Sequence, residues 1–320
     1  FYDPKKIFNH AKKAFDDEDW RVRASVATAV ADLALKHEEF AHETLVLLME
    51  KLETEEHYNV TANILRGIAR LFNSYDLKDR ERAYSIALSM LETPNSDVKH
   101  GSIALLTSLA IWMEDKVTEI VKKITDVFNS LPPLVRGHTF SLLRKIYEKY
   151  PDKIHNLLTP LALEHMTNEN HIVTSEALST VALLIRNGHL ELNELLLREI
   201  DKKLKIGKDA ERISSVSVLD AIFEKNPTLA DLYLKTLGNL LLTTKNNHLK
   251  LKILECLMRH IDDIPRDTIN RHQLARILDI LEFNTTPKNP SLRRIKTMAR
   301  SLLEDKLGYG FEDRRRLRGY

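Results

Sequence analysis

The chain has 320 residues, of which 43% are hydrophobic and 29% are charged, and its formal net charge is +2. This balance excludes an intrinsically disordered chain, which would be poorer in apolar residues and carry a larger net charge. No apolar run approaches the roughly 18 residues that a membrane-spanning helix needs, so we expect no membrane partner. The one cysteine, Cys256, has no partner for an internal disulfide, which favours an intracellular protein of the cytoplasm or, in a eukaryote, of the nucleus.

Apolar residues recur at helical spacing along the whole chain, and short turns rich in Pro, Asn, Asp, Thr and Gly separate the segments. Strict two-residue alternation, which is typical of strands, is absent. The turns group the segments into pairs, and we expect the second helix of each pair at residues 20–36, 57–73, 97–114, 134–150, 171–187, 209–226, 247–262 and 291–307. The sequence therefore predicts an all-α fold.

A small apolar residue stands near the start of each of these second helices. These marker residues are Val22, Val60, Val98, Val135, Val173, Ile213, Leu251 and Leu292, at intervals of 38, 38, 37, 38, 40, 38 and 41 residues. Such a period is the signature of a solenoid of helical hairpins, in which each unit buries its apolar face against its neighbours. We expect repeats 1 to 7 and the first helix of repeat 8 over 1–283, a basic capping helix that completes repeat 8 over 284–307, and a basic tail over 308–320.

The first of these second helices resembles the second helix of a HEAT repeat. It reads Asp19-Trp20-Arg21-Val22-Arg23-Ala24, with an acid that opens the helix and a Val-Arg pair before small core residues. Val98-Lys99 and Val135-Arg136 echo the pair, repeats 5 to 8 depart from it, and three-helix armadillo-like units are the alternative. The resemblance implies a right-handed superhelical solenoid of about eight antiparallel hairpins, with the second helices along a concave wall. It also implies a scaffold or adaptor that binds macromolecules.

Polar residues beside the buried stripe of the second helices are candidates for a partner-binding surface on the concave face. These residues are Arg21, Asn59, Asn63, Arg66, Arg70, His138 and Lys145. Side by side they would form a polar, mildly basic strip suited to hydrogen bonds with a peptide or a phosphate backbone. In the third repeat Gly101, Ala104 and Ser108 occupy the corresponding positions and interrupt the strip. An ordinary solvated face is the alternative.

The second candidate surface is a basic patch near the C-terminus. From residue 284 onward ten Lys and Arg stand against four acids, which gives a net charge of +6, whereas residues 1–283 carry −4. The patch comprises Arg293, Arg294, Lys296, Arg300, Arg314, Arg315 and Arg316, and aromatic residues are interleaved in the tail. Arginines among aromatics can contact phosphates and stack on bases, or dock on an acidic protein surface. A solvated capping helix with a basic tail is the alternative.

Motifs that carry catalysis are absent from the sequence. It contains no glycine-rich phosphate loop, no zinc-protease motif and no nucleophile elbow, so we expect no catalytic residue and no cofactor. Cys256 and His260 lie one helical turn apart, but two residues without a third and fourth ligand are weak evidence for zinc, so no metal site is predicted. A remote enzymatic alternative is a HEAT-like DNA glycosylase, with Trp20 or Trp112 beside acidic residues that are otherwise typical of turns and caps.

We therefore expect a non-catalytic scaffold or adaptor that binds a macromolecular partner, a protein above all, along the concave surface. The alternative is binding of a nucleic-acid backbone through the concave basic residues and the basic C-terminal segment. Fold alone does not decide between these partners. The sequence leaves the oligomeric state open.

Overall fold

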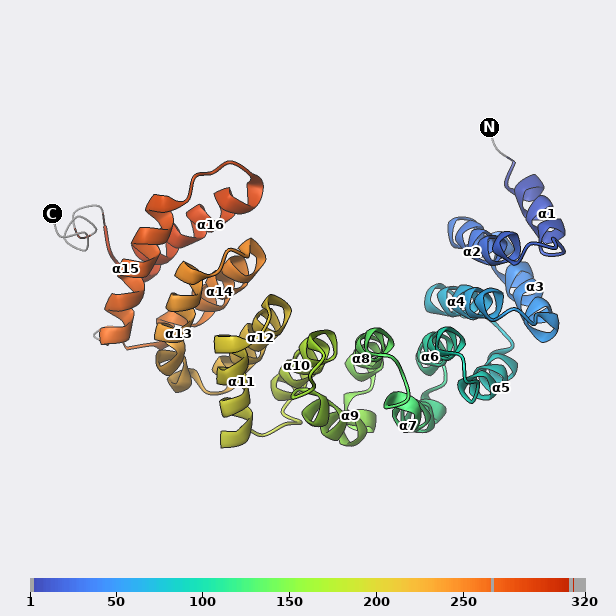
Figure 1. Ribbon diagram of the computed structural model, residues 1–320, viewed down its shortest axis with the longest axis horizontal. Helices are drawn as coiled ribbons and strands as arrows, with labels where there is room; N and C mark the ends of the chain where they lie inside the picture. The colour runs from blue at the N-terminus through green and yellow to red at the C-terminus, as the bar shows by residue number, and fades with distance from the viewer. Residues whose placement is uncertain (1–2, 266–267, 311–312, 314–320) are drawn as a thin grey trace. The chain divides into compact units, whose positions relative to one another are not determined.

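The computed structural model describes residues 3–265, 268–310 and 313. In these residues it contains sixteen α-helices and no strand, which confirms the predicted all-α fold of eight hairpins (Figure 1). The helices form two compact units, residues Phe1–Leu158 and Thr159–Tyr320, and the boundary falls within one helix. Among the described residues, no helix combines the length and the apolar character needed to cross a membrane.

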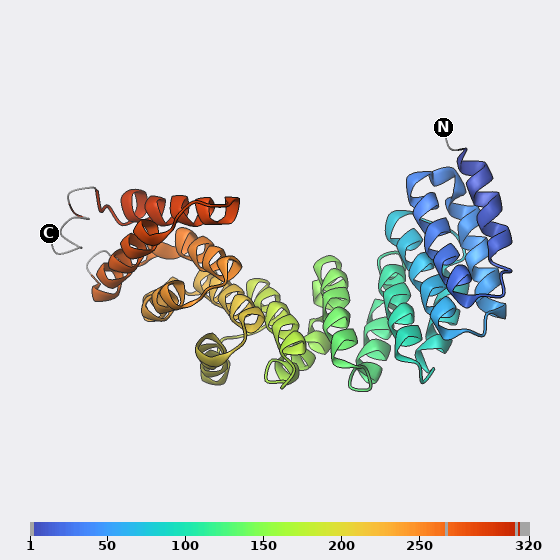
Figure 2. The same cartoon turned by 45° about the horizontal axis from the view of Figure 1, so that its top comes forward.

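The first unit is built from helical hairpins. Its helices are α1 (Pro4–Ala14), α2 (Trp20–Lys36), α3 (Ala41–Thr54), α4 (Tyr58–Ser74), α5 (Arg80–Leu91), α6 (Ser96–Ala110), α7 (Val117–Phe128) and α8 (Pro133–Lys149). The second helices α2, α4, α6 and α8 lie side by side, and each packs on the next (Figures 1 and 2). We call them the second-helix layer of the first unit. The helices α1, α3, α5 and α7 form the other layer.

The second unit repeats this arrangement. Its helices are α9 (Pro151–His165), which crosses the boundary, α10 (His171–Arg186), α11 (Glu194–Ile206), α12 (Asp209–Lys225), α13 (Ala230–Thr243), α14 (Asn247–His260), α15 (Ile269–Asn284) and α16 (Pro290–Ser301), which continues into a π-helical turn (Leu302–Lys306). The helices α10, α12, α14 and α16 pack on one another in order. They form the second-helix layer of this unit.

Side-chain caps fix where the second helices begin. Asp19, Asn95, Asn170 and Asn246 each accept a hydrogen bond from a backbone N–H of the first turn, which satisfies a donor that has no partner inside the helix. Every second helix starts within one residue of its predicted position, including α4 and α8, which lack a side-chain cap. The ends are less regular: α6 stops at Ala110 instead of residue 114, because a turn and a 3-10 helix (Glu114–Lys116) follow it.

The marker residues are not equally buried. Val60, Val98, Val135 and Val173 are buried in their layers, as expected for core positions, whereas Ile213, Leu251 and Leu292 of the second unit are only half-buried. The expectation that Val22 is buried is wrong, since this residue is 36% exposed. Among the described residues α2 packs on only one other second helix, α4, so one flank of α2 stays open around Val22. Packing between repeats therefore decides the burial of this position.

A close approach between two second helices of the first unit occurs at Gly101 on α6. A Cβ atom at this position would lie 3.0 Å from the carbonyl oxygen of Ala62 and 3.0 Å from the Cβ of Leu65, both on α4. Such contacts are too short for a methyl group, so glycine allows the two helices to pack at this distance.

Candidate functional site

A row of polar side chains crosses three neighbouring second helices of the first unit. The Oδ1 atom of Asn63 accepts a hydrogen bond of 3.1 Å from the Arg66 guanidinium on α4. Arg66 acts electrostatically on His100 of α6, and the rings of His100 and His138 of α8 are 5.3 Å apart. We call Asn63, Arg66, His100 and His138 the polar row. It brings three of the predicted strip residues together.

Burial determines the protonation state of His100 in the polar row. Desolvation of the imidazole, reinforced by the charges of Arg66 and His138, lowers the pKa of His100 to about 4. His100 is therefore neutral at pH 7, where one ring nitrogen donates a hydrogen bond and the other accepts one. The row thus offers the Arg66 guanidinium beside the neutral His100 ring and the Asn63 amide instead of a dense positive charge.

The remaining strip residues are divided between paired and open positions. Arg21 binds the carboxylate of Asp19 through Nε and a terminal nitrogen, at 3.0 and 2.8 Å, although its side chain is largely exposed. Arg70 of α4 forms an ion pair with Asp32 of α2 and so connects two repeats. Asn59 is half-buried and Lys145 is exposed. The predicted strip is therefore not one continuous basic track.

His100 was missed as a candidate because helical spacing placed its neighbour Gly101 on the strip. Adjacent helical residues point about 100° apart, so a difference of one residue moves the prediction to another face. The available signal was the recurrence of histidine near the starts of second helices, at His57, His100 and His138. In the structure His57 stacks on Trp20 of the preceding repeat, with ring centroids 4.4 Å apart.

Opposite charges about one repeat apart join the second helices to their neighbours. Arg23 donates two hydrogen bonds of 2.8 and 2.9 Å to the carboxylate of Glu55. These bonds lower the pKa of Glu55, although burial opposes the shift. In the second unit Arg294 binds Glu255 at 2.6 Å across 39 positions. Charges in such pairs stabilise the contacts between repeats and are less available to a partner protein.

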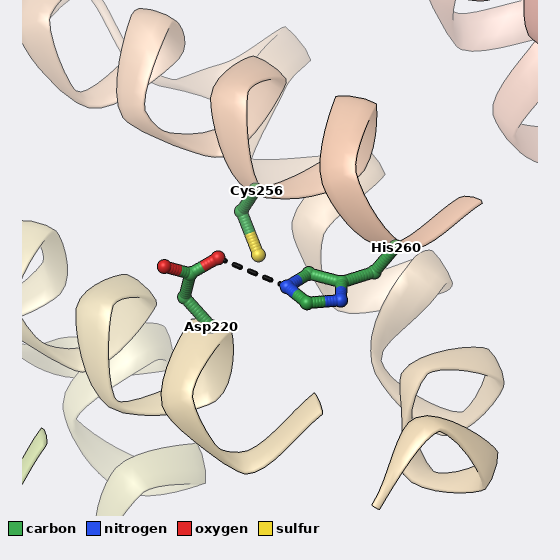
Figure 3. A group of neighbouring side chains, drawn as sticks. All are labelled: Asp220, Cys256 and His260. Carbon is green, nitrogen blue, oxygen red and sulfur yellow. Dashed lines mark hydrogen bonds and ion pairs between the residues drawn. The ribbon is translucent and has the colours of Figure 1, made fainter. Parts of the chain in front are cut away.

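The most buried of these pairings centres on Asp220 of α12, which is fully buried. Its Oδ2 atom accepts hydrogen bonds from Arg186 of α10, at 2.6 Å, and from Arg259 of α14, at 2.7 Å. Its Oδ1 atom lies 3.0 Å from Nε2 of His260, as Figure 3 shows. One carboxylate thus joins three consecutive second helices.

Asp220, Cys256 and His260 also form the one group of potential metal ligands found among the described residues, with ligand atoms within 4.8 Å of one another (Figure 3). A metal would need the Cys256 thiolate, yet burial, together with the charge of Asp220, raises the pKa of this thiol far above its ordinary range. Two arginines already occupy the Asp220 carboxylate. The donor set therefore fits a hydrogen-bonded structural cluster better than a zinc site.

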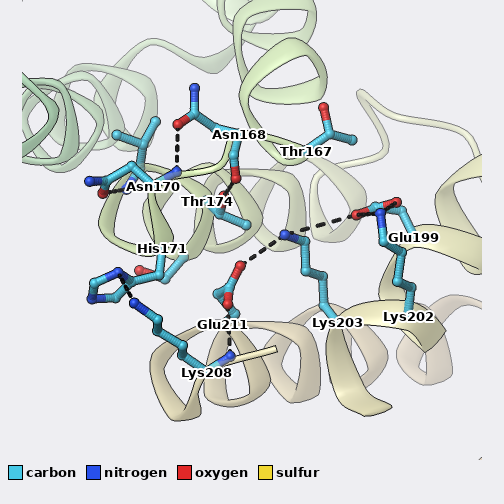
Figure 4. A network of polar contacts seen from close by, with 12 residues as sticks. Thr167, Asn168, Asn170, His171, Thr174, Glu199, Lys202, Lys203, Lys208 and Glu211 are labelled. Carbon is cyan, nitrogen blue, oxygen red and sulfur yellow. Dashed lines mark hydrogen bonds and ion pairs between the residues drawn. The ribbon is translucent and has the colours of Figure 1, made fainter. Parts of the chain in front are cut away.

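A second polar network joins repeats 5 and 6 (Figure 4). Glu211, buried at the start of α12, accepts hydrogen bonds from Nζ of Lys203, at 2.8 Å, and from the backbone N–H of Lys208, at 2.7 Å. Burial alone would raise the pKa of Glu211, but these two bonds outweigh it and lower the pKa. The side chain of Lys208 in turn lies 3.1 Å from Nδ1 of His171. These contacts hold the hairpins together.

The basic patch divides into three parts. Arg293, Lys296 and Arg300 share one face of α16, where they line a pocket with Pro287 and Thr297. Arg294 points elsewhere and pairs with Glu255. The predicted residues Arg314, Arg315 and Arg316 lie outside the described residues.

The two tryptophans of the glycosylase alternative serve in packing contacts. Trp20 stacks on His57, and the Trp112 indole N–H donates to the carbonyl oxygen of Phe72. Asp19, beside Trp20, caps α2 and binds Arg21. In the described residues, these acids thus act as caps and ion-pair partners.

Solved structures of karyopherins resemble this chain. A structure of Kap95p, reported with RanGDP, aligns with a TM-score of 0.57 and 14% identity over 97% of this chain and 46% of its own. Kap121p bound to Ste12p aligns with a TM-score of 0.55 and 13% identity, over 95% of this chain and 33% of its own. Kap121p bound to the extreme C-terminus of the phosphatase Cdc14p gives 0.54 and 14%, over 95% and 34%.

The chain thus spans between a third and a half of the length of these karyopherins. No family model matches its sequence, and no curated protein matches it. At such low identity the likeness concerns the fold. The hairpins of the two units and this structural likeness show that the chain has the fold of HEAT-repeat helical solenoids.

Proposed function

We propose that this chain is a non-catalytic scaffold that binds a segment of a partner protein along the second-helix layer of its first unit, with the basic residues of α16 as a second contact. The observation that carries the proposal is the polar row. It places donors and acceptors from α4, α6 and α8 beside one another, a spacing that suits successive groups of an extended peptide. Kap121p, which shares the fold, is bound to Ste12p in one structure and to the C-terminus of Cdc14p in another.

The pairing of charges favours a protein partner over a nucleic acid. Of the strip cations in the first unit, Arg21 and Arg70 bind acids of the chain itself. Binding to a phosphate backbone requires several unpaired cations along a track, because the release of counterions from many phosphates supplies most of the affinity. The row instead presents Arg66 beside the Asn63 amide and the neutral His100 ring.

A charge-reversal pair tests the proposal. Arg66→Glu with Lys145→Glu changes the second-helix layer, and Lys122→Glu with Lys123→Glu makes the same change in net charge at exposed positions of α7, in the other layer. Proteins captured by the unchanged chain are purified and their affinities for both variants are measured. We expect the variant with Arg66→Glu and Lys145→Glu, which we call the row variant, to lose at least one partner that the α7 variant retains. Equal binding of every partner to both variants would contradict a site on the second-helix layer.

Nucleic-acid binding stays the second candidate, because the segment from residue 284 onward carries a net charge of +6. A salt titration with a generic duplex and a single strand distinguishes the two candidates. A phosphate-backbone binder loses affinity steeply as salt rises, whereas no measurable binding at low salt would exclude this candidate.

A further inference from the structure

The pocket on α16 gathers cations that share one helical face. Arg293, Lys296, Thr297 and Arg300 stand at positions i, i+3, i+4 and i+7, which project from the same side of a helix. Together with Pro287 they line an open cavity of about 370 Å³. This volume suits one small anionic group with the chain that carries it.

A buried carboxylate beneath the pocket orients two of these cations. Glu282 of α15 is only 4% exposed and accepts a hydrogen bond of 2.7 Å from Arg300. Nζ of Lys296 lies 3.9 Å from the same oxygen. Each cation keeps further N–H groups beyond the one directed at Glu282, and 54% of the Arg300 side chain is exposed. The acid therefore positions the donors without using all of them.

Arg293 completes the pocket as an open donor. Its side chain is exposed, and among the described residues no hydrogen bond or ion pair engages it. The Thr297 hydroxyl is exposed on the same face. An incoming anion would thus meet two guanidinium groups, an ammonium group and a hydroxyl group, which match the oxygens of a phosphate.

The surroundings of the pocket favour one terminal phosphate over a polyanion. Arg294 is neutralised by Glu255, Arg259 by Asp220 and Lys306 by Asp262, and Glu304 acts electrostatically on Arg300 from the next turn. Arg294, Arg259 and Lys306 therefore do not extend the pocket cations into a track, and among the described residues Lys288, exposed beside Pro287, adds one further open charge. A phosphate monoester presents three terminal oxygens to such a cluster, whereas a backbone diester presents two.

We infer that the pocket formed by Pro287, Arg293, Lys296, Thr297 and Arg300 binds a phosphorylated serine or threonine of a partner protein. This inference rests on the scaffold role proposed above and assigns the chemistry of its second contact.

The test uses the whole chain and a blocked tripeptide, acetyl-Gly-phosphoserine-Gly-amide, with its unphosphorylated form and dimethyl phosphate as comparison probes. Binding is followed by NMR at the arginine Nε–H groups. We expect saturable binding of the phosphopeptide alone, and roughly tenfold weaker binding by Arg293→Gln and by Arg300→Gln, since each removes a charge-assisted hydrogen bond.

Arg294→Gln is the matched control, because it removes an equally exposed charge from the same helix but not from the pocket. It should bind the phosphopeptide as the unchanged chain does, and thermal melts should show that every variant is folded at the temperature of the titration. Equal loss with Arg294→Gln, or no saturable binding, would overturn the inference. Equal binding of dimethyl phosphate would overturn it in favour of a nucleic-acid backbone. If the phosphopeptide fails while the row variant still loses a partner, only this inference falls and the proposed function stands.

Discussion

Replacing Asp220 by asparagine should destabilise the second unit more than any surface change. The carboxylate accepts hydrogen bonds from Arg186 and Arg259 and lies beside His260, so it joins α10, α12 and α14. Asp220→Asn keeps the size of the side chain but removes its charge and leaves one accepting oxygen in place of two, so the amide N–H2 group must face either the guanidinium groups or His260. Removal of one partner from a buried ion pair costs about 3–5 kcal/mol.

The exposure of the two arginine side chains places the expected cost of Asp220→Asn at the lower end of this range. The side chains of Arg186 and Arg259 are 35% and 49% exposed, so both guanidinium groups regain water once the carboxylate charge is lost. The penalty for stranding them is therefore smaller than for fully buried cations, and we expect a loss of about 3 kcal/mol in the free energy of unfolding.

Glu224→Gln provides a matched control, because Glu224 accepts a hydrogen bond of 3.2 Å from the same Arg186 but is 40% exposed. An exposed pair contributes at most about 1 kcal/mol. Urea unfolding followed by circular dichroism gives both values, and amide exchange in α12 localises the effect, since arrays of repeats can unfold in parts. Similar losses in Asp220→Asn and Glu224→Gln would refute the view that the buried carboxylate holds the three helices together.

Three further predictions address other contacts. Glu55→Gln should cost about 2 kcal/mol at pH 7, because it removes the carboxylate charge and one of the two oxygens that accept from Arg23. Because the folded-state pKa of Glu55 is lowered, this difference should vanish as the pH falls through that pKa; urea midpoints at pH 7 and pH 3 that differ equally would contradict it. Gly101→Ala should lower the melting temperature, because crowding against Ala62 costs about 1–3 kcal/mol and exceeds the gain in helix propensity; an unchanged or higher melting temperature would show that α4 and α6 separate freely. The Cys256 thiol, whose pKa burial raises, should react with a disulfide reagent only after unfolding, so rapid labelling at pH 7 without urea would disprove its burial.

The sequence predicted the hairpins well because their signals are local. A cap such as Asn95 or Asn246 acts on N–H groups two or three residues away, so it can be recognised without knowledge of the fold. The marker period succeeded for a related reason, since each repeat packs mainly on its neighbours. It failed at Val22, which lies on an open flank of α2, and it was only partly right for Ile213, Leu251 and Leu292, which are half-buried.

The side-chain partners could not be predicted in the same way. Asp220 on α12 contacts Arg259 on α14 because the two residues, 39 positions apart, lie at matching positions of neighbouring second helices. A shift of one residue on either helix would turn one of the two side chains about 100° away. The repeat period varies by several residues along the chain, which exceeds this tolerance. Hence the sequence indicated which helices meet, but not that His100 lies between Arg66 and His138.

Contacts between repeats reduce the charge that the C-terminal segment presents to a partner. The net charge of +6 counts every cation of the segment as free to bind a partner. Arg294 and Lys306, however, form ion pairs with Glu255 and Asp262, which lie before residue 284. Their charge is cancelled across the stack, not along the sequence, so a count restricted to the segment overstates the field that it presents. In α16 the cations that remain able to bind a partner lie in the pocket, where Arg293 has an open side chain and Glu282 orients Lys296 and Arg300. A few oriented cations in a compact cavity recognise one anionic group, whereas a long polyanion requires a row of open cations, from which the pairing of Arg294 and Lys306 removes two.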